Sequence, residues 1–215
     1  MKIKWLGHSS FLVTSEDGTK IVTDPYSVGG GISYAPINQS ADVVTISHNH
    51  GDHNNDRAIK GNPQSIKEEG IRKAKGIEFK GIPSHHDAIQ GSERGGNIIF
   101  CFTIDCINIC HLGDLGHILD HKQIADIGSV DILLIPVGGY YTIDYKQATT
   151  ISKSLRPKVV IPMHYKTSKC GYPISKVDEF LKGKKNVRRL DLNEVDYKQS
   201  ELPEQAEIVV LHHAL

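Results

Sequence analysis

The hydrophobic positions of this chain occur mostly in short runs separated by turn residues, a pattern that is typical of β-strands. Apolar and polar residues alternate in several runs, as in the N-terminal Met-Lys-Ile-Lys-Trp-Leu-Gly. Glu16-Asp17-Gly18-Thr19 separates the second run from the third and favours a tight hairpin turn. The pattern predicts strands at residues 3–6, 11–14, 20–23, 42–47, 76–82, 97–104, 106–111, 131–137, 158–163 and 207–211.

Helical sequence is scarcer than strand sequence. The pattern predicts helices at residues 119–127, 144–155 and 174–181. Asp120 is a candidate cap for the first helix, and the second opens with the capping-box form Asp144-x-x-Gln147. Pro157 stops the second helix, and Pro173 opens the third.

The order of these elements predicts the fold class. Strands dominate the first half of the chain and alternate with helices in the second half, which favours an α/β (α+β) fold of two mixed β-sheets with helices outside them. We see no repeat, low-complexity tract or clear linker, so we expect a single domain over residues 1–215. The polar segment 54–75 fits either a flexible arm over a site or a loose hairpin.

The charge balance excludes some classes of partner. Lys+Arg and Asp+Glu number 25 each, so no net charge draws the chain to nucleic acid or to a membrane surface. No apolar segment reaches the roughly 18 residues of a membrane span, and the N-terminus lacks the apolar core of a signal peptide. We therefore expect a cytoplasmic protein with no membrane or nucleic-acid partner.

Candidate chemistry begins at residues 45–57, TISHNHGDHNNDR, where His48, His50, Asp52 and His53 fall within six positions. In an extended backbone alternate side chains point the same way, so His48 and His50 can bind one ion together. Gly51 permits a sharp turn, after which Asp52 and His53 can face a second ion. Two ions about 3.5–4 Å apart are a known arrangement for activating water, and they need more ligands than these four.

Further ligands are expected at other strand ends. The pair His85-His86 follows one predicted strand, and Asp114 and His164 follow the ends of two others. Asp24 follows an earlier strand. A lone histidine after a strand is more often an ordinary surface or capping residue, so each position is weak by itself. The combination, in this order, indicates a metal site along one rim of a sheet sandwich.

With these positions in place, the sequence resembles the metallo-β-lactamase superfamily. The resemblance rests on an early Asp, then His-x-His-x-Asp-His, then a distant His, a distant Asp and a last His. The segments WLGHSS, TDP, HLGDLGH, LLIPVGG and IPMHYKT look like its ascorbate-phosphate lactonase-like branch, in particular the small metal-dependent hydrolases of that branch. The resemblance covers nearly the whole chain. It implies a four-layer αββα sandwich and, because this branch often self-associates, a homo-oligomer is a further expectation.

The resemblance also implies roles for the residues that match its motifs. His48, His50 and His86 would hold a first metal, Asp52, His53 and His164 would hold a second, and Asp114 would bridge the two. Asp52 and Asp114 are then the carboxylates expected to take part in catalysis. Asp24 would hydrogen-bond a ligand histidine and fix its tautomer. The family pattern favours His86 over His85, because an acidic residue follows His86 directly.

Two further residues keep two interpretations each. His8 matches the Gly-His of this branch and either lies at the mouth of the site or is a plain strand-end histidine. Tyr141 follows Gly138-Gly139 at a strand end, and it either donates its hydroxyl into the pocket or packs as an aromatic residue.

The implied reaction is hydrolysis. Two divalent cations lower the pKa of a shared water from about 15.7 towards neutrality, and the resulting metal-bound hydroxide would attack an ester-type bond in a phosphodiester, a phosphoester or a lactone. Imidazole and carboxylate ligands without cysteine favour Zn²⁺ and also admit Mn²⁺ or Fe. Two alternatives stay open. One is a di-iron oxidoreductase, which usually carries Glu at the position of His50, and the other is a metal-binding protein without turnover.

Overall fold

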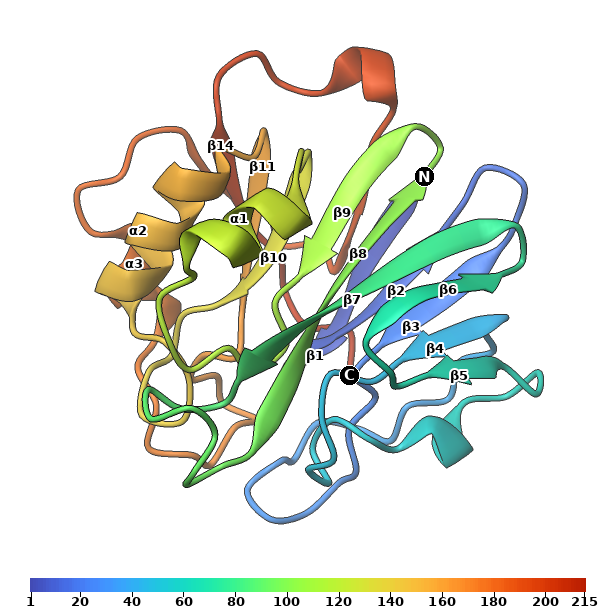
Figure 1. Ribbon diagram of the computed structural model, residues 1–215, viewed down its shortest axis with the longest axis horizontal. Helices are drawn as coiled ribbons and strands as arrows, with labels where there is room; N and C mark the ends of the chain where they lie inside the picture. The colour runs from blue at the N-terminus through green and yellow to red at the C-terminus, as the bar shows by residue number, and fades with distance from the viewer.

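Two β-sheets pack face to face in the computed structural model, which describes residues 1–215 (Figure 1). The first sheet has the strand order β13-β1-β2-β3-β4-β5 and the second the order β12-β14-β11-β10-β9-β8-β7-β6. The strands of the first sheet are β1 (Lys2–Gly7), β2 (Ser10–Thr14), β3 (Lys20–Thr23), β4 (Val43–Thr45), β5 (Gln64–Ile66) and β13 (Glu194–Asp196). Those of the second are β6 (Gly70–Ala74), β7 (Ile77–His85), β8 (Gly96–Ile104), β9 (Ile107–His111), β10 (Ile132–Pro136), β11 (Val159–Met163), β12 (Val187–Arg189) and β14 (Glu207–Val210).

Both sheets are mixed, as the sequence predicts. In the first, β1, β2 and β3 are antiparallel neighbours, and β4 and β5 then continue parallel to β3. In the second, β9, β10 and β11 run parallel, and β7 runs the same way as β9 because both are antiparallel to β8. The carboxyl ends of β7, β9 and β11 therefore lie at the same end of the second sheet, and the candidate site forms there.

The core lies between the sheets. Its largest side chains come from both of them and include Trp5, Phe11, Phe79 and Phe100, each at most 1% exposed. Strands β10 and β11 are buried at every position. This burial follows from their parallel pairing in the middle of the second sheet, where both faces of a strand are covered.

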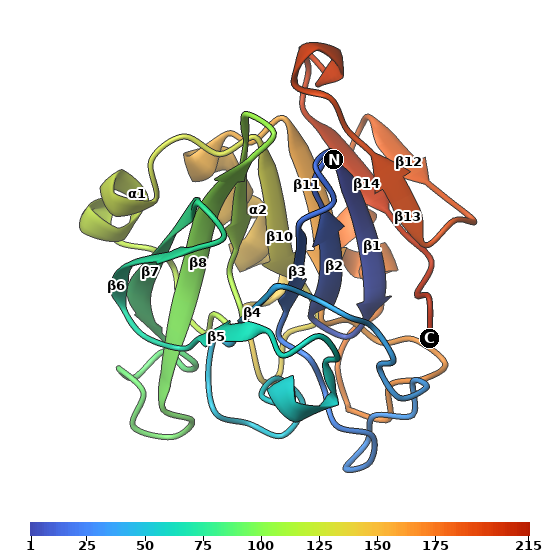
Figure 2. The same ribbon diagram turned by 90° about the vertical axis from the view of Figure 1, so that its right-hand side faces the viewer.

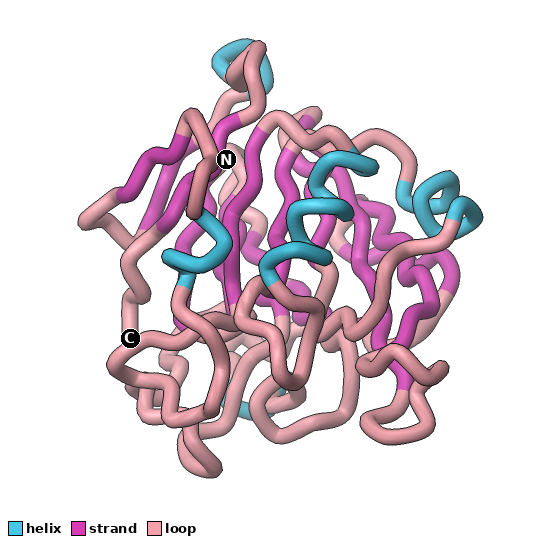
Figure 3. The backbone as a smooth tube through the Cα atoms, turned by 90° about the vertical axis from the view of Figure 1, so that its left-hand side faces the viewer, coloured by secondary structure: helices cyan, strands magenta, loops and turns pink.

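Three α-helices cover the outer face of the second sheet (Figure 3). They are α1 (His121–Ile127), α2 (Tyr145–Leu155) and α3 (Val177–Leu181). Asp120 and Asp144 cap the first two helices, and each forms a complete capping box with the glutamine three positions later, as predicted for Asp144. No helix has both the length and the apolar character that a membrane crossing requires.

Helix α3 begins later than the predicted range 174–181. Ser175 is held between two loops, because its N–H donates to the Gly138 carbonyl at 2.7 Å and its carbonyl accepts from Lys166 N–H at 2.8 Å. These bonds keep the backbone before Lys176 outside the helix. Pro173 therefore marks the end of the preceding loop rather than the first turn.

The outer face of the first sheet is covered by chain without α-helices (Figure 2). A second apolar cluster forms there, in which Leu12, Val22 and Val44 of the sheet meet Tyr26 and Tyr34 of the long β3–β4 connection. The 3₁₀ turn η1 (Asp56–Ala58) lies nearby, and η2 (Gln199–Glu201) precedes β14. The expected sandwich of two sheets is thus present, and an irregular layer stands on this side where the resemblance implies helices.

Segment 54–75 is neither an arm nor a hairpin. Strand β5 pairs parallel with β4 at the edge of the first sheet, whereas β6 pairs antiparallel with β7 at the edge of the second. The segment therefore passes from one sheet to the other and joins their two edges on the same side of the molecule.

Candidate metal centre

Strand ends place the candidate residues. Asp24 follows β3 directly, His86 follows β7 and His164 follows β11, while His48 and Asp114 lie three residues beyond β4 and β9. Parallel strands whose carboxyl ends lie at the same end of a sheet bring residues from distant parts of the sequence together.

A tight turn adds the rest of the early cluster. The backbone N–H groups of His53 and Asn54 both donate to the His50 carbonyl, at 2.9 and 3.1 Å. The chain therefore folds back directly after His50. This turn sends Asp52 and His53 to one side of the cluster while His48 and His50 remain on the other.

Asp114 lies at the centre of the cluster. Its Oδ2 atom is 3.2 Å from His53 Nε2 and from His164 Nε2, 3.3 Å from His86 Nε2 and 4.0 Å from His48 Nε2. Donor atoms that share a tetrahedral ion at about 2.0–2.1 Å lie about 3.3 Å apart. The spacing around Asp114 is therefore that of atoms which coordinate common ions.

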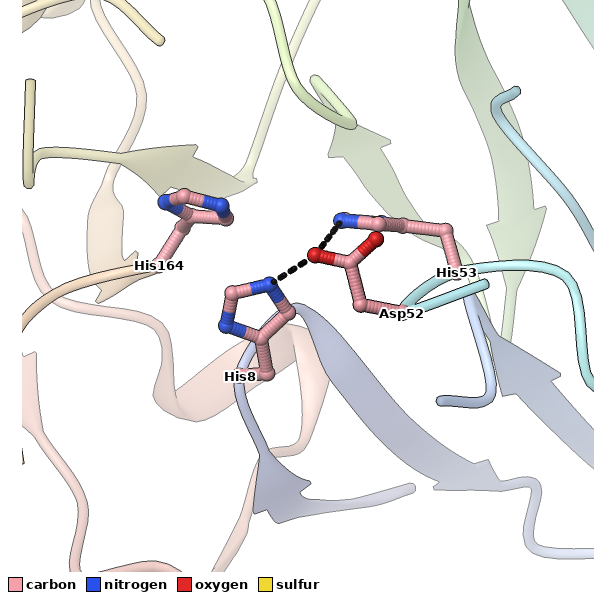
Figure 4. Close-up of side chains that lie close together, drawn as sticks. All are labelled: His8, Asp52, His53 and His164. Carbon is pink, nitrogen blue, oxygen red and sulfur yellow. Dashed lines mark hydrogen bonds and ion pairs between the residues drawn. The ribbon is translucent and has the colours of Figure 1, made fainter. Parts of the chain in front are cut away.

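The donor atoms form two main groups on either side of Asp114. In the first group the donor atoms of His48, His50 and His86 lie within 4.8 Å of one another, and in the second those of His8, Asp52, His53 and His164 do so. Figure 4 shows the second group, with the His8 ring between His164 and the Asp52 carboxylate. The two groups match the two predicted ligand sets, with His8 as an addition to the second.

Several buried polar atoms of the cluster have no hydrogen-bond partner. They are His8 Nδ1, His48 Nε2, His53 Nε2, His86 Nδ1, Asp114 Oδ1 and His164 Nδ1. Buried polar atoms normally have partners, and orphaned ones are costly. Two of the unpaired atoms, His48 Nε2 and His53 Nε2, face the Asp114 carboxylate. Imidazole nitrogens and a carboxylate without other partners are the donor types that Zn²⁺ and similar divalent ions prefer, so the residues fit a metal centre.

Asp24 hydrogen-bonds two residues of this region, Ser47 and His53. It is fully buried, and its carboxylate accepts hydrogen bonds from Ser47 N–H at 2.8 Å, from the Ser47 hydroxyl and from His53 Nδ1 at 2.9 Å. His53 Nδ1 donates to Asp24, so Nε2, the atom that faces Asp114, is the ring nitrogen left to bind a metal ion. The predicted hydrogen bond from Asp24 to a candidate ligand histidine is therefore present.

Burial keeps two of the imidazoles neutral. Burial, together with the nearby positive charge of His53, lowers the pKa of His48 to about 3. Burial and the neighbouring His164 lower the pKa of His8 to about 4. At neutral pH both rings therefore carry a free lone pair.

The carboxylates stay ionised. Burial would raise the pKa of Asp114, but the charges of His164 and His53 hold it well below its usual range. Burial would likewise raise the pKa of Asp52, but the hydrogen bond from His8 and the charge of His53 together hold this pKa below its usual range.

The structure separates the two interpretations of the His85-His86 pair. His86 belongs to the first group, whereas His85 lies outside every group of donor atoms, with its ring 5.6 Å from that of His117. His8 is fully buried, and its Nε2 lies 3.2 Å from Asp52 Oδ2, so it lies inside the cluster rather than at its mouth.

A cavity of about 330 Å³ opens over the cluster, and it contains two residues that sequence reasoning missed. Tyr141 lines it, in agreement with one of its two interpretations, and Arg94 and Tyr172 line it as well. The Tyr172 hydroxyl donates to Asp52 Oδ2 at 3.2 Å. No motif marks either residue, since Arg94 reads as part of a glycine-rich turn and Tyr172 as the residue before a helix-opening proline.

Three residues of the cluster have left-handed backbone conformations. The φ angles are +52° at His8, +39° at Asp24 and +49° at His164. Such angles are uncommon for residues other than glycine and they concentrate at functional sites. In each case the chain turns sharply directly after a strand, which directs the side chain into the cluster.

Gly116→Ala should destabilise the segment that carries Asp114. A Cβ atom at Gly116 would collide with the backbone of His86 and Asp87. We expect the free energy of unfolding, measured by urea denaturation, to fall by about 1–3 kcal/mol. Gly96→Ala is the control, because its Cβ would meet only Ser84 O, at 3.9 Å. Equal losses in the two variants would contradict this close contact.

Comparison with known proteins agrees with this geometry. The family model described as "Beta-lactamase superfamily domain" matches residues 2–164. A UPF0173 metal-dependent hydrolase from Pelotomaculum thermopropionicum is 34% identical over 196 residues, which cover 78% of this chain and 85% of that protein. Another from Archaeoglobus fulgidus is 30% identical and covers 94% of this chain and 97% of its own length.

A solved structure extends the agreement to the fold. A metallo-β-lactamase superfamily protein from Thermotoga maritima has a TM-score of 0.82 and 39% identity, with 98% of this chain and 97% of that chain covered. From the family model, these relatives and the shared fold it follows that the chain belongs to the metallo-β-lactamase superfamily, among the UPF0173 metal-dependent hydrolases.

Proposed function

We propose that the chain binds two divalent metal ions in this centre and uses them to hydrolyse an ester-type bond in a small molecule. The position of Asp114 supports the proposal most directly. Its carboxylate lies 3.3 Å from His86 in the first group and 3.2 Å from His53 and His164 in the second. A carboxylate shared between two clusters of imidazoles is suited to two ions held close together, as in hydrolytic two-metal sites.

The two donor groups define the ligands in this proposal. His48, His50 and His86 hold one ion, Asp52, His53 and His164 hold the other, and Asp114 bridges them. His8 also lies in the second group, but its Nε2 already contacts Asp52 Oδ2. We therefore give His8 the role of orienting the Asp52 carboxylate.

The chain's own residues prepare the reaction. When bound, divalent ions supply the charge that brings the pKa of water near neutrality and stabilises negative charge on the substrate. Asp52 is ionised and borders the cavity, where its carboxylate can accept a proton from water. His8 and Tyr172 hold this carboxylate from two sides, and Asp24 fixes the tautomer of His53.

The types of ligand atom limit which metal ions the centre is suited to bind. Five imidazoles and two carboxylates without a thiolate favour Zn²⁺, and they also suit Mn²⁺ or Fe. The candidate substrates are phosphodiesters, phosphomonoesters and lactones, since a two-ion site activates water against carbon and phosphorus alike.

Metal analysis of the full chain tests this proposal. We expect about two equivalents of Zn²⁺ after reconstitution, measured by atomic emission, and hydrolysis of at least one phosphodiester, phosphomonoester or lactone. A chelator should remove both the metal and the hydrolysis, and added Zn²⁺ should restore them. One equivalent at saturation would contradict the two-ion centre, and iron-dependent redox turnover without hydrolysis would contradict the reaction.

A further inference from the structure

We infer that the substrate of the proposed hydrolysis carries an anionic group beside the reacting bond, and that Arg94 binds this group. The inference rests on the proposed function and adds the substrate class. Five of the eight residues that line the cavity over the centre are candidate metal ligands. The other three are Arg94, Tyr141 and Tyr172, and Arg94 is the one lysine or arginine among them.

A preformed loop positions Arg94. The β7–β8 loop folds around the buried carboxylate of Asp87, which accepts the backbone N–H groups of Ile89, Gly91, Glu93 and Arg94 at 2.8–3.0 Å. Four donors on one carboxylate fix the backbone of Arg94 through contacts within the loop itself. Most residues of the loop are exposed, and the backbone of Arg94 is held at the cavity by these hydrogen bonds to Asp87.

The guanidinium group of Arg94 contacts an aromatic ring at the cavity. Its central carbon lies 5.7 Å from the centroid of the Tyr141 ring, within the range of a cation–π contact. Tyr141 in turn packs edge-to-face on Tyr172, with ring centroids 5.4 Å apart, and Tyr172 donates to Asp52. Arg94 is therefore connected through two packed rings to a carboxylate of the metal centre.

Arg94 lies where two cavities meet. A second cavity of about 520 Å³ adjoins the first, and both are lined by His50 and Arg94. Lys67 and Glu69 also line the larger cavity, but Lys67 is already paired with Asp56 at 2.8 Å. A substrate whose ester lies at the centre and whose remaining part extends into the larger cavity would pass the guanidinium group.

The present partner of Arg94 is weak. Its Nη1 lies 3.3 Å from Glu93 Oε2, and the Glu93 side chain is 61% exposed. Exposed ion pairs contribute little, whereas a guanidinium group binds a carboxylate or a phosphate through two parallel hydrogen bonds. An anionic substrate can therefore replace Glu93. Carboxylate and phosphate share this chemistry, and the test separates them.

Matched esters test the inference in the full chain with both metals bound. The mono-4-nitrophenyl esters of fumaric acid and of (E)-3-phosphonoacrylic acid carry a second acid group that the trans double bond keeps from attacking the ester, and each is compared with the ester whose second acid group is methylated. We expect wild type to prefer an anionic ester at least about tenfold in kcat/KM. Arg94→Gln should remove this preference by lowering kcat/KM for that ester about 10–100-fold, with less than about threefold change on the methylated esters.

Two further variants serve as controls. Arg94→Lys should retain part of the preference, because an ammonium group keeps the charge but loses the two-pronged geometry. Arg72→Gln replaces an exposed arginine of β6 that lines neither cavity. It should leave kcat/KM unchanged for the anionic and for the methylated esters. Metal content is measured for every variant, so that loss of ions is not mistaken for loss of substrate binding.

A binding measurement keeps the inference separate from the proposed reaction. Calorimetry should show that succinate or 3-phosphonopropionate binds Arg94→Gln about 10–100-fold more weakly than wild type. If the two-metal protein cleaves neither these esters nor any phosphodiester, phosphomonoester or lactone, the proposed reaction fails, and calorimetry still decides the role of Arg94. If Arg94→Gln keeps both the substrate preference and the binding of these anions, the inference is overturned and the proposed reaction stands.

Discussion

Asp114→Asn is expected to lower the rate of hydrolysis about a thousandfold and to reduce the bound metal from two equivalents to at most one. Asp114 offers two oxygens at the point where the two groups of imidazoles meet, and four histidine Nε2 atoms lie within 4.0 Å of its Oδ2. Asparagine keeps the shape of the side chain but removes the charge and one acceptor oxygen. In the proposed centre, two bound cations would then lack the carboxylate charge that would neutralise part of their own.

The Asp114 experiment needs metal analysis beside the assay. Asp126→Asn is the matched control, since Asp126 lies on α1 and pairs with Lys122 at 2.7 Å, in a part of the chain that contributes nothing to the centre. We expect the control to keep two equivalents and full activity. An Asp114→Asn protein that retains both metals and hydrolyses at the wild-type rate would rule out the bridging role.

Asp24→Asn is expected to weaken Zn²⁺ binding about 10–100-fold and to lower the free energy of unfolding of the metal-free protein by at least about 3 kcal/mol. The carboxylate accepts three hydrogen bonds in a fully buried position. The asparagine amide would direct N–H groups towards His53 Nδ1 and the Ser47 hydroxyl. His53 would then accept at Nδ1 and carry its proton on Nε2, the atom that faces Asp114.

Zinc titration and urea denaturation measure the two effects of Asp24→Asn separately. Asp42→Asn is the control: Asp42 also accepts a backbone N–H, from Lys20 at 3.0 Å, but its side chain is 35% exposed. We expect its loss to stay below about 1 kcal/mol, with unchanged Zn²⁺ affinity. Unaltered Zn²⁺ affinity in Asp24→Asn would show that the tautomer of His53 does not depend on Asp24.

Local signals in the sequence account for the well-predicted elements. Strand β3 has the predicted bounds, because the turn Glu16-Asp17-Gly18-Thr19 precedes it and Asp24-Pro25 follows it. Helix α2 begins directly after Asp144, because the capping box is a local structure that depends on a few neighbouring residues. Such elements carry their boundaries within a short stretch of sequence.

The elements that sequence reasoning missed depend on distant partners. Strand β6 is exposed at four of its five positions, so no alternation of apolar and polar residues marks it. It is a strand only because β7 offers an edge for pairing. The late start of α3 has a similar cause, since loops from two other parts of the chain hold Ser175.

The residues of the candidate centre also differ in whether local sequence or only the folded chain marks them. The spacing of His48, His50, Asp52 and His53 is a local signal, and the later His and Asp positions stand out because each follows a strand. Arg94 and Tyr172 lie in irregular loops, and they reach the cavity through packing that only the folded chain defines. Residues that line the cavity beside the centre are therefore harder to predict here than residues suited to bind metal.

The left-handed backbone conformations at His8, Asp24 and His164 lower the stability of the fold, while they place the side chains that the proposed function needs. Each such residue costs about 1–2 kcal/mol relative to a relaxed backbone, and glycine would remove most of that cost. Glycine would also delete an imidazole or a carboxylate from the centre. Selection for heat resistance alone would thus erode these three positions, and their persistence in a lineage would record continuing selection for catalysis.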